Sequence, residues 1–389
     1  MSEINKWPCF SKVEADAVSK VLLSNKVNYW TGEEGKKFEQ EFSEWCGTKY
    51  AVALSNGTVA LEIALRALGV GPGDEVIVTP RSFIASVSCV INVAAKPIFA
   101  DVDLNSGNIY PASIKNVISP KTKAIICVHL SGFPCELDEI LNIAVENNLF
   151  VIEDCAQSHG AVYKSKRVGS IGHIGCWSFC QDKIMTTGGE GGMITTNNDI
   201  LWRKIWSLKD HGKSYKAVYE VKHPPGYRWL HDSFGSNFRM TEMQATIGRI
   251  QLKKIENWNK KRSEVATLLT QTFMKFDSLI RIPELNPSFI HAWYKFCVYV
   301  KDQGLAKDWN RDRIIEEINQ NGIPCFSGPC PEIYLEKAFQ KNSKPQKRLN
   351  NAKKLGESTL MFLVHPSLSK VDIENSCETI DLILKKALK

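Results

Sequence analysis

The chain has 389 residues, of which 43% are hydrophobic and 10% aromatic, so it can bury a sizeable core and is not a disordered protein. Lys and Arg outnumber Asp and Glu by 49 to 42, but the basic residues are spread along the whole chain. A nucleic-acid-binding protein would concentrate them in a stripe, so the sequence predicts no nucleic-acid partner.

Membrane spans and metal sites are not expected either. No stretch approaches the roughly 20 apolar residues that a membrane span needs, and the segment Met1–Pro8 holds no signal-peptide core. We therefore expect a cytoplasmic protein whose twelve cysteines are reduced. The pairs Cys176/Cys180 and Cys325/Cys330 lack a second pair or His partners at zinc-site spacing, so no metal site is predicted.

Short β-branched runs alternate with helical stretches from Ala51 to about Thr196. The predicted strands are 75–79, 96–101, 124–129 and 150–154, and the predicted helices are 59–68, 82–94 and 137–147. This repeated order is typical of an α/β fold, in which helices cover both faces of a mostly parallel sheet. The binding crevice of such a sheet lies beyond the carboxyl ends of its strands.

The first candidate site is the segment Leu54-Ser-Asn-Gly-Thr58, which directly precedes the first of these helices. Backbone N–H groups at such a helix start bind phosphate, and the positive end of the helix dipole favours an anion. Gly57 lets the backbone approach the ligand closely, and Thr58 adds a hydroxyl donor. The alternative is an ordinary turn and helix cap without a ligand.

Asp154 ends the predicted strand 150–154, at the edge of the sheet where the crevice is expected. A carboxylate there is suited to pair with the protonated ring nitrogen of a cofactor, because the opposite charge keeps both groups ionised. Gln157 follows three residues later and could face the same ring. The alternative is that Asp154 only caps the next helix.

Lys183 lies between a strand-like segment and the run Gly188-Gly-Glu-Gly-Gly192, in a position that projects into a crevice. Burial or a nearby positive charge lowers the pKa of such a lysine, whose amine is then available for a Schiff base. Ser178 is placed to add a hydroxyl donor for phosphate. A Schiff-base lysine and a carboxylate for a ring nitrogen together indicate pyridoxal 5′-phosphate (PLP). The glycines match neither the GxGxxG nor the P-loop spacing of a nucleotide loop.

The second half of the chain is less regular. Residues 202–239 are rich in Gly, Pro, His and aromatics, and we expect a long ordered loop there. A long helix over 242–260 is predicted to link a large domain of residues 1–260 to a small domain of residues 261–389. In the small domain the sequence predicts a strand at 293–300, a helix at about 308–321, and a terminal helix after the start signal Ser369-Lys-Val-Asp372.

Four motifs in this order resemble those of the DegT/StrS family of nucleotide-sugar aminotransferases. They are Ala67-Leu-Gly-Val-Gly-Pro-Gly-Asp-Glu-Val76, Glu153-Asp-Cys-Ala-Gln-Ser-His-Gly160, the run Cys176–Gly192, and Asn237-Phe-Arg-Met-Thr-Glu242. The resemblance covers nearly the whole chain. It implies PLP as the cofactor and the aspartate-aminotransferase fold (PLP fold type I), with a large domain around a mostly parallel sheet and a smaller C-terminal α+β domain.

The resemblance also implies roles around the cofactor ring. Lys183 would carry PLP and move the proton between substrate carbon and cofactor. Asp154 would hold the ring nitrogen, and Gln157 would lie near the ring hydroxyl. Phe83 would stack on the ring face, a role that suits an aromatic side chain. The alternative for Phe83 is core packing.

The cofactor phosphate would be bound by Gly57, Thr58 and Ser178. In the family, the segment that matches Asn237 reaches the phosphate of the neighbouring subunit's cofactor. The resemblance therefore implies a homodimer with shared active sites, whereas the alternative for Asn237 is a helix cap.

Two half-reactions follow from the resemblance. An amino acid, by family habit L-glutamate, gives its amino group to the cofactor, and a nucleotide-linked keto sugar then accepts it. The product is an amino sugar for surface polysaccharide such as O-antigen. Family members with Thr-Thr-Gly after the lysine, as Thr186-Thr-Gly188 here, often act at sugar carbon 4, and we expect that position.

Three further residues are candidates for substrate contact. Arg81 stands where the family more often has a small or polar residue, and it either contacts substrate or pairs on the surface. Trp30 and Thr31 precede a family-like segment and are candidates to line the sugar pocket, with core packing as the alternative. The loop Ser327–Glu332 departs from the family pattern, which leaves the sugar contacts there open.

Other functions remain as alternatives. A sugar dehydratase branch of the family has histidine in place of the lysine, so Lys183 argues against that chemistry. A cysteine desulfurase also uses PLP, but it usually has His before the lysine, where this chain has Asp182. A regulator that binds PLP or an amino sugar without turnover would keep most of these residues.

Overall fold

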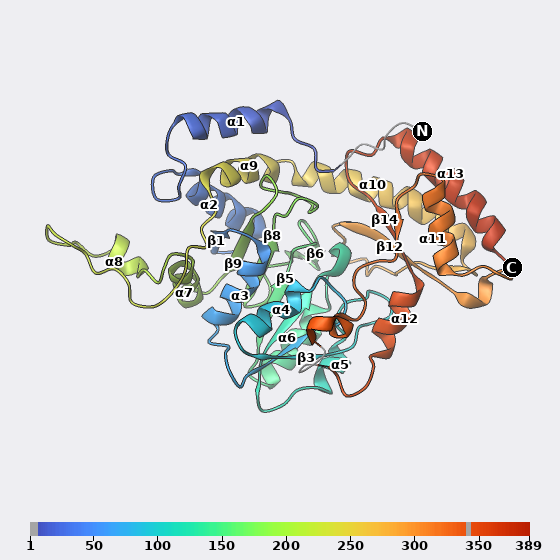
Figure 1. Cartoon of the computed structure of the whole chain (residues 1–389), viewed down its shortest axis with the longest axis horizontal. Coiled ribbons are helices and arrows are strands. Elements are labelled where there is room, and N and C mark those ends of the chain that lie inside the picture. The colour runs from blue at the N-terminus through green and yellow to red at the C-terminus, as the bar shows by residue number, and fades with distance from the viewer. Residues whose placement is uncertain (1–6, 340–343) are drawn as a thin grey trace.

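A seven-stranded sheet forms the centre of the computed structural model, which describes residues 7–339 and 344–389 (Figure 1). The strands, in their order across the sheet, are β1 (Tyr50–Leu54), β9 (Gly192–Thr196), β8 (Ile174–Ser178), β5 (Phe150–Asp154), β4 (Thr122–Val128), β2 (Glu75–Val78) and β3 (Lys96–Phe99). Neighbouring strands run parallel except at β9, which is antiparallel to β1 and β8. The predicted mostly parallel sheet is confirmed.

Helices cover both faces of this sheet because its strands are apolar on both sides. In β1, Ala51 and Ala53 pack into one core, while Val52 and Leu54 pack into the other. The first core is closed by α2 (Glu34–Cys46) and α6 (Leu137–Glu146), and the second by α3 (Gly57–Ala67), α4 (Ala85–Asn92) and α7 (Asp199–Lys209). The predicted strands and helices of residues 59–154 match these elements.

A separate core lies in the C-terminal part of the chain, beginning at Val265. It is formed by a four-stranded antiparallel sheet and three helices. These are β10 (Ile280–Arg281), β12 (Lys295–Val300), β14 (Thr359–Leu363), β13 (Cys325–Phe326), α10 (Ile255–Phe273), α11 (Arg311–Gln320) and α13 (Lys370–Ala387). The predicted strand and both predicted helices are present, and the hydroxyl of Ser369 accepts the backbone N–H of Asp372 at 3.1 Å. The division at residue 260 stays a prediction, and it falls inside α10.

The single helix predicted over 242–260 is wrong in its extent. Two helices, α9 (Glu242–Leu252) and α10, follow each other, and α10 continues to Phe273. Lys253 and Lys254, between them, keep backbone angles close to helical values. No Gly or Pro marks the interruption, so the apolar periodicity alone could not reveal it.

The loop predicted over 202–239 is also only partly correct. Its first residues belong to α7, where the Asn198 side chain accepts the backbone N–H of Leu201, and α8 (Tyr215–Tyr219) is a further short helix. The segment around α8 projects from the rest of the molecule (Figure 1). We call residues 219–234 the aromatic arm, because Tyr227, Trp229 and Phe234 on it are 75, 83 and 94% exposed.

Three α-helices and one small sheet remain in the described residues, beside short 3-10 helices. They are α1 (Lys12–Leu23), α5 (Pro111–Lys115), α12 (Asn350–Ser358), and a small sheet of β11 (Phe289–Ile290), β6 (Val162–Tyr163) and β7 (Lys166–Arg167). Within the residues that the structure describes, no helix is both long enough and apolar enough to cross a membrane.

Candidate active site

A cleft of about 830 Å³ opens at the carboxyl ends of β5 and β8, between the large sheet and the small C-terminal sheet. Seven of the predicted site residues line it, and they are Gly57, Thr58, Phe83, Asp154, Gln157, Ser178 and Lys183. The cleft therefore lies where the topology of a parallel sheet predicts a binding site. Asn237, Trp30, Thr31 and Arg81 are not among its lining residues.

Asp154 ends β5 with its carboxylate buried at the bottom of the cleft. Its Oδ2 accepts the hydroxyl of Ser86 at 2.7 Å, and its Oδ1 accepts the backbone N–H of Ala156 at 3.1 Å. Burial raises the pKa of Asp154, while these hydrogen bonds and the charge of Lys183 act in the opposite direction. No helix follows Asp154, so the alternative role as a helix cap is wrong. No cation of residues 7–339 and 344–389 forms an ion pair with this carboxylate, and a protonated ring nitrogen would supply that partner.

Gln157 lies in the turn after β5 and is held by the backbone of Ser131. Its Oε1 atom accepts the backbone N–H of Ser131 at 2.8 Å. The amide oxygen is thus fixed, and the NH2 group is left as a donor toward the cleft.

The N-terminus of α3 forms a cradle of backbone N–H groups beside Ser178. The side chain of Asn56 caps the helix by accepting the N–H of Val59 at 2.9 Å. The first N–H groups of a helix have no partner within it, and here they belong to Gly57 and Thr58. A Cβ atom on Gly57 would lie 2.6 Å from the Cβ of Ser178, so only glycine allows this close approach. The cradle fits an anion such as a phosphate group.

Lys183 points into the cleft and contacts Tyr294, the residue directly before β12. Its Nζ atom lies 3.4 Å from the hydroxyl of Tyr294 and 3.7 Å from Oδ1 of Asp182. The Tyr294 hydroxyl also donates to Asp182. Burial acts to raise the pKa of Asp182, but the charge of Lys183 and the bond from Tyr294 hold it below its usual value. The three side chains form one hydrogen-bonded group around the lysine amine.

Phe83 is 66% exposed, so the alternative of core packing is wrong. Its ring lines the cleft and is free to cover a planar ligand. Asn237 is exposed and pairs through its backbone with Asp210, whereas Thr241 caps α9, so the helix-cap alternative for Asn237 is wrong as well.

Arg81 is 2% exposed, which makes surface pairing wrong for this residue. Its guanidinium donates to the hydroxyl of Tyr299 at 3.2 Å and to the hydroxyl of Thr359 at 2.9 Å. Arg81 therefore joins the loop after β2 to the small sheet, beside a separate inner cavity. A substrate contact for it stays a prediction.

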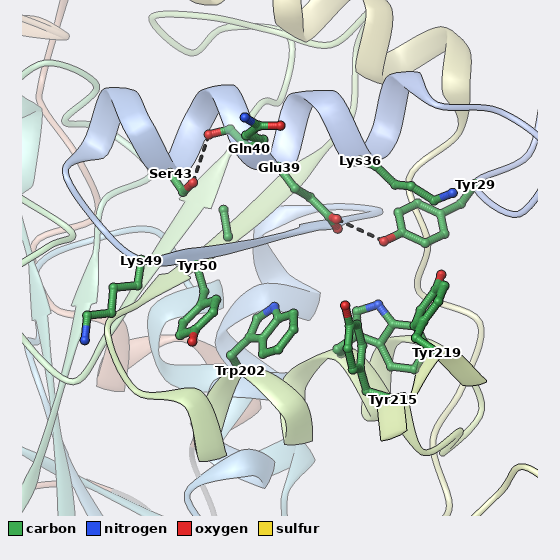
Figure 2. A pocket seen from close by; sticks show the side chains of 12 residues that line it. Tyr29, Lys36, Glu39, Gln40, Ser43, Lys49, Tyr50, Trp202, Tyr215 and Tyr219 are labelled. Carbon is green, nitrogen blue, oxygen red and sulfur yellow. Dashed lines mark hydrogen bonds between the residues drawn. The ribbon is translucent and has the colours of Figure 1, made fainter. Parts of the chain in front are cut away.

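Trp30 and Thr31 lie away from the cleft. The Trp30 ring is 6.1 Å from the ring of Trp206 and 6.4 Å from that of Tyr219, between their centres. Trp206 and Tyr219 line a second hollow of about 370 Å³ between α2 and α7, where aromatic rings gather beside Glu39 (Figure 2). Thr31 is exposed, and its hydroxyl donates to the carbonyl of Asn28. Packing accounts for the position of Trp30, and a sugar contact stays a prediction for both.

A buried group of His129, Glu153 and Cys155 offers ligand atoms within 4.8 Å of one another. Nδ1 of His129 accepts the backbone N–H of Cys135, so Nε2 carries the hydrogen toward Glu153, 3.1 Å away. Glu153 also accepts three backbone N–H groups. Because these atoms are already paired, the group is a structural network.

Sequence reasoning missed several residues of the cleft, above all Ser86, Ser131, Tyr294 and Lys295. Asp182, directly before Lys183, is the sequence feature that could have pointed to a partner such as Tyr294. Nothing in the sequence marks which residue of the strand 293–300 reaches the lysine.

Taken together, the fold and the cleft define an enzyme of PLP fold type I, because a buried carboxylate, an anion cradle and a lysine face one another as that cofactor requires. Residues 8–381 match the DegT/DnrJ/EryC1/StrS aminotransferase family, and the chain belongs to this family. It is a PLP-dependent sugar aminotransferase.

Known proteins of the family resemble the chain over most of its length. The structure of an aminotransferase from Psychrobacter cryohalolentis is 57% identical, covers 99% of both chains and has a TM-score of 0.97. GDP-perosamine synthase of Caulobacter vibrioides is 34% identical over 91% of this chain and 92% of its own length. UDP-N-acetyl-3-dehydro-alpha-D-glucosamine 3-aminotransferase of Acidithiobacillus ferrooxidans is 36% identical over 75% of this chain and 74% of its own length. These names include sugars on different nucleotides.

Proposed function

We propose that the chain moves an amino group from L-glutamate to a nucleotide-linked keto sugar, at sugar carbon 4. The observation that carries the proposal is the position of Lys183 and Asp154 in one cleft with the anion cradle of α3. Names of relatives support a nucleotide-linked substrate. Thr186-Thr-Gly188 supports carbon 4, although three relatives are named for carbon 3. The amino sugar would serve surface polysaccharide, and a cytoplasmic location stays a prediction from the sequence.

PLP, when bound, supplies an electron sink for the bond-breaking step. The residues of this chain supply binding and proton movement. The cradle of Gly57 and Thr58, with the hydroxyl of Ser178, would hold the phosphate. Asp154 would keep the ring nitrogen protonated, and the Phe83 ring would cover one face of the cofactor. The Lys183 amine would move the proton, held in place by Tyr294 and Asp182.

We also propose that the protein is a homodimer. The aromatic arm exposes Trp229 and Phe234 almost completely in the single chain. Aromatic side chains of this size are rarely left in water, and they are common at the centre of subunit interfaces. Asn237 lies shortly after the arm in the sequence, so a second copy packed there would bring Asn237 near a neighbouring subunit.

The absorbance spectrum of the purified protein tests the proposed function. We expect a band near ~420 nm that falls on addition of glutamate while a band near ~330 nm rises. Lys183→Ala should lack the first band. Product formation is then followed by mass spectrometry with 4-keto and 3-keto sugars on UDP, GDP and dTDP. A band that glutamate leaves unchanged, with no amino sugar formed, would favour a regulator that binds PLP without turnover.

A further inference from the structure

Lys295 lies on the small-domain side of the cleft, among apolar neighbours. The small sheet presents four side chains to the cleft, which are Lys295 of β12, Phe326 of β13, and Met361 and Leu363 of β14. These residues are neighbours through the strand pairings of that sheet. Lys295 is the one charged residue among the four.

The ammonium group of Lys295 has no anionic partner within residues 7–339 and 344–389. It makes no hydrogen bond or ion pair there, and its Nζ atom lies 4.7 Å from the centre of the Tyr294 ring. Asp182 attracts it over a longer range, but the Asp182 carboxylate is already engaged by Tyr294 and Lys183. A half-buried cation in this position is stabilised when a ligand supplies the anion.

The surroundings of Lys295 carry an excess of positive charge. Burial lowers the pKa of Lys295, Asp182 raises it, and the charges of Arg262 and Lys183 lower it further. Arg262 is buried, its Nη1 donates to the carbonyl of Trp293 at 3.3 Å, and its Nε and Nη2 have no partner in the described part of the chain. This charge distribution favours an anionic ligand at the small-domain side of the cleft.

Lys295 is close to the lysine that reacts. The Nζ atom of Lys183 lies 4.9 Å from the centre of the Tyr294 ring, and the Nζ atom of Lys295 lies 4.7 Å from the same centre. The two nitrogens are therefore separated by at most the sum of these two distances. The side-chain carboxylate of glutamate extends roughly 6 Å from its amino nitrogen, and an ion pair adds about 3 Å. A dicarboxylic amino acid therefore reaches nearly as far as the largest separation that these two distances allow.

We propose that Lys295 binds the side-chain carboxylate of the amino donor and so selects glutamate over neutral amino acids. The inference rests on the proposed function. Lys183 and Lys295 are the only cationic residues that line the cleft in the described part of this subunit, and Lys183 is committed to the cofactor. The phosphates of a nucleotide sugar fit less well, because they are attached at carbon 1, across the sugar ring from the reacting carbon 4.

Single-turnover loss of the ~420 nm band tests the assignment, measured against donor concentration for L-glutamate and for L-glutamine, which lacks the side-chain charge. Lys295→Met should raise the half-saturating glutamate concentration at least roughly tenfold, because a charge-assisted hydrogen bond is lost. The half-saturating concentration of L-glutamine should change little. Lys295→Arg should recover most of the glutamate affinity. Lys49→Met, a change at an exposed lysine beside the second hollow, is the control.

Two results would overturn the assignment. In the first, Lys295→Met leaves the half-saturating concentration of glutamate unchanged, or raises that of L-glutamine by the same factor. In the second, Lys295→Met weakens only the binding of the nucleotide sugar, which would make Lys295 a phosphate-binding residue. Failure of the proposed function is distinguishable from both, because the unaltered protein would then lack the ~420 nm band or its response to glutamate.

Discussion

The hydroxyl of Tyr294 lies 3.4 Å from the Nζ atom of Lys183, so the strand region that leads into β12 holds the lysine presented by the large sheet. Tyr294 also donates to Asp182, which lies in the loop after β8. The geometry of the reactive amine thus depends on how the C-terminal part packs against the large sheet.

Tyr294→Phe should slow the reaction with glutamate roughly tenfold, because one hydrogen bond that orients the amine is removed. The ~420 nm band should be retained, since Lys183 itself is unchanged. Stopped-flow absorbance measures both. The matched control is Tyr215→Phe in the second hollow, and equal rates for the two variants would contradict a positioning role for Tyr294.

Gly57→Ala should weaken PLP binding at least roughly tenfold and lower the free energy of unfolding by about 1–3 kcal/mol, because the new Cβ overlaps Ser178. Equilibrium dialysis of PLP and thermal unfolding provide the two measurements. Gly71→Ala is the control, since a Cβ atom there meets nothing within 4 Å. Normal PLP affinity in Gly57→Ala would show that the start of α3 is not the phosphate site.

Glu153→Gln should lower the free energy of unfolding by roughly 2–4 kcal/mol, because the buried carboxylate accepts from His129 and from three backbone N–H groups. Burial acts to raise the pKa of Glu153, but these bonds hold it below the usual value near 4.5. Its contribution is therefore complete above that value and is lost as the pH falls through the lowered pKa.

Denaturant unfolding between neutral pH and pH 3 checks this, and Glu153→Gln should show a weaker dependence on pH than the unaltered chain. Glu256→Gln, at the exposed pair with Arg167, should change stability by less than about 1 kcal/mol. A stable Glu153→Gln protein would contradict a structural role for the network.

Glutamate affinity should fall as the pH rises toward the pKa of Lys295, which burial lowers, because the neutral amine no longer attracts a carboxylate. Arg262, Lys183, Asp182 and Cys297 act on this pKa, and the Tyr294 ring lies beside the amine. In Lys295→Arg the decline should disappear, since arginine stays charged. The same decline in both variants would assign the pH dependence to another group.

Replacing Trp229 and Phe234 together by serine should convert the proposed dimer to a monomer, because the arm loses its two most exposed rings. Analytical ultracentrifugation gives the mass directly. Loss of activity with an unchanged far-UV spectrum would fit an active site completed by the second subunit. A dimer that survives the double change would place the interface elsewhere.

The sequence predicts those parts of the site that lie within a few residues of one another. Asp154 follows a run of buried β-branched residues, and Gly57 and Thr58 precede an apolar helix, so local pattern and sheet topology place all three. Lys183 and Ser178 are found in the same way, from the end of one strand.

Contacts between distant segments could not be predicted in this way. Tyr294 and Lys295 reach the cleft only because the small sheet packs against the large one, and no local pattern encodes that packing. Arg81 is a case in which the sequence pattern misleads. A charged residue in a loop is usually exposed, but Arg81 is buried because Tyr299 and Thr359 of the small sheet pack against it and accept its hydrogen bonds.

The helix α10 begins at Ile255, which packs in a core of the large sheet, and continues through Val265 and Phe273 into the C-terminal core. A continuous helix, with its backbone hydrogen bonds intact, therefore passes through residue 260. A rotation at that point would break backbone hydrogen bonds of the helix, whereas the interruption at Lys253 and Lys254 lies before its first residue. The two sheets are thus connected by a continuous helix rather than by a flexible linker.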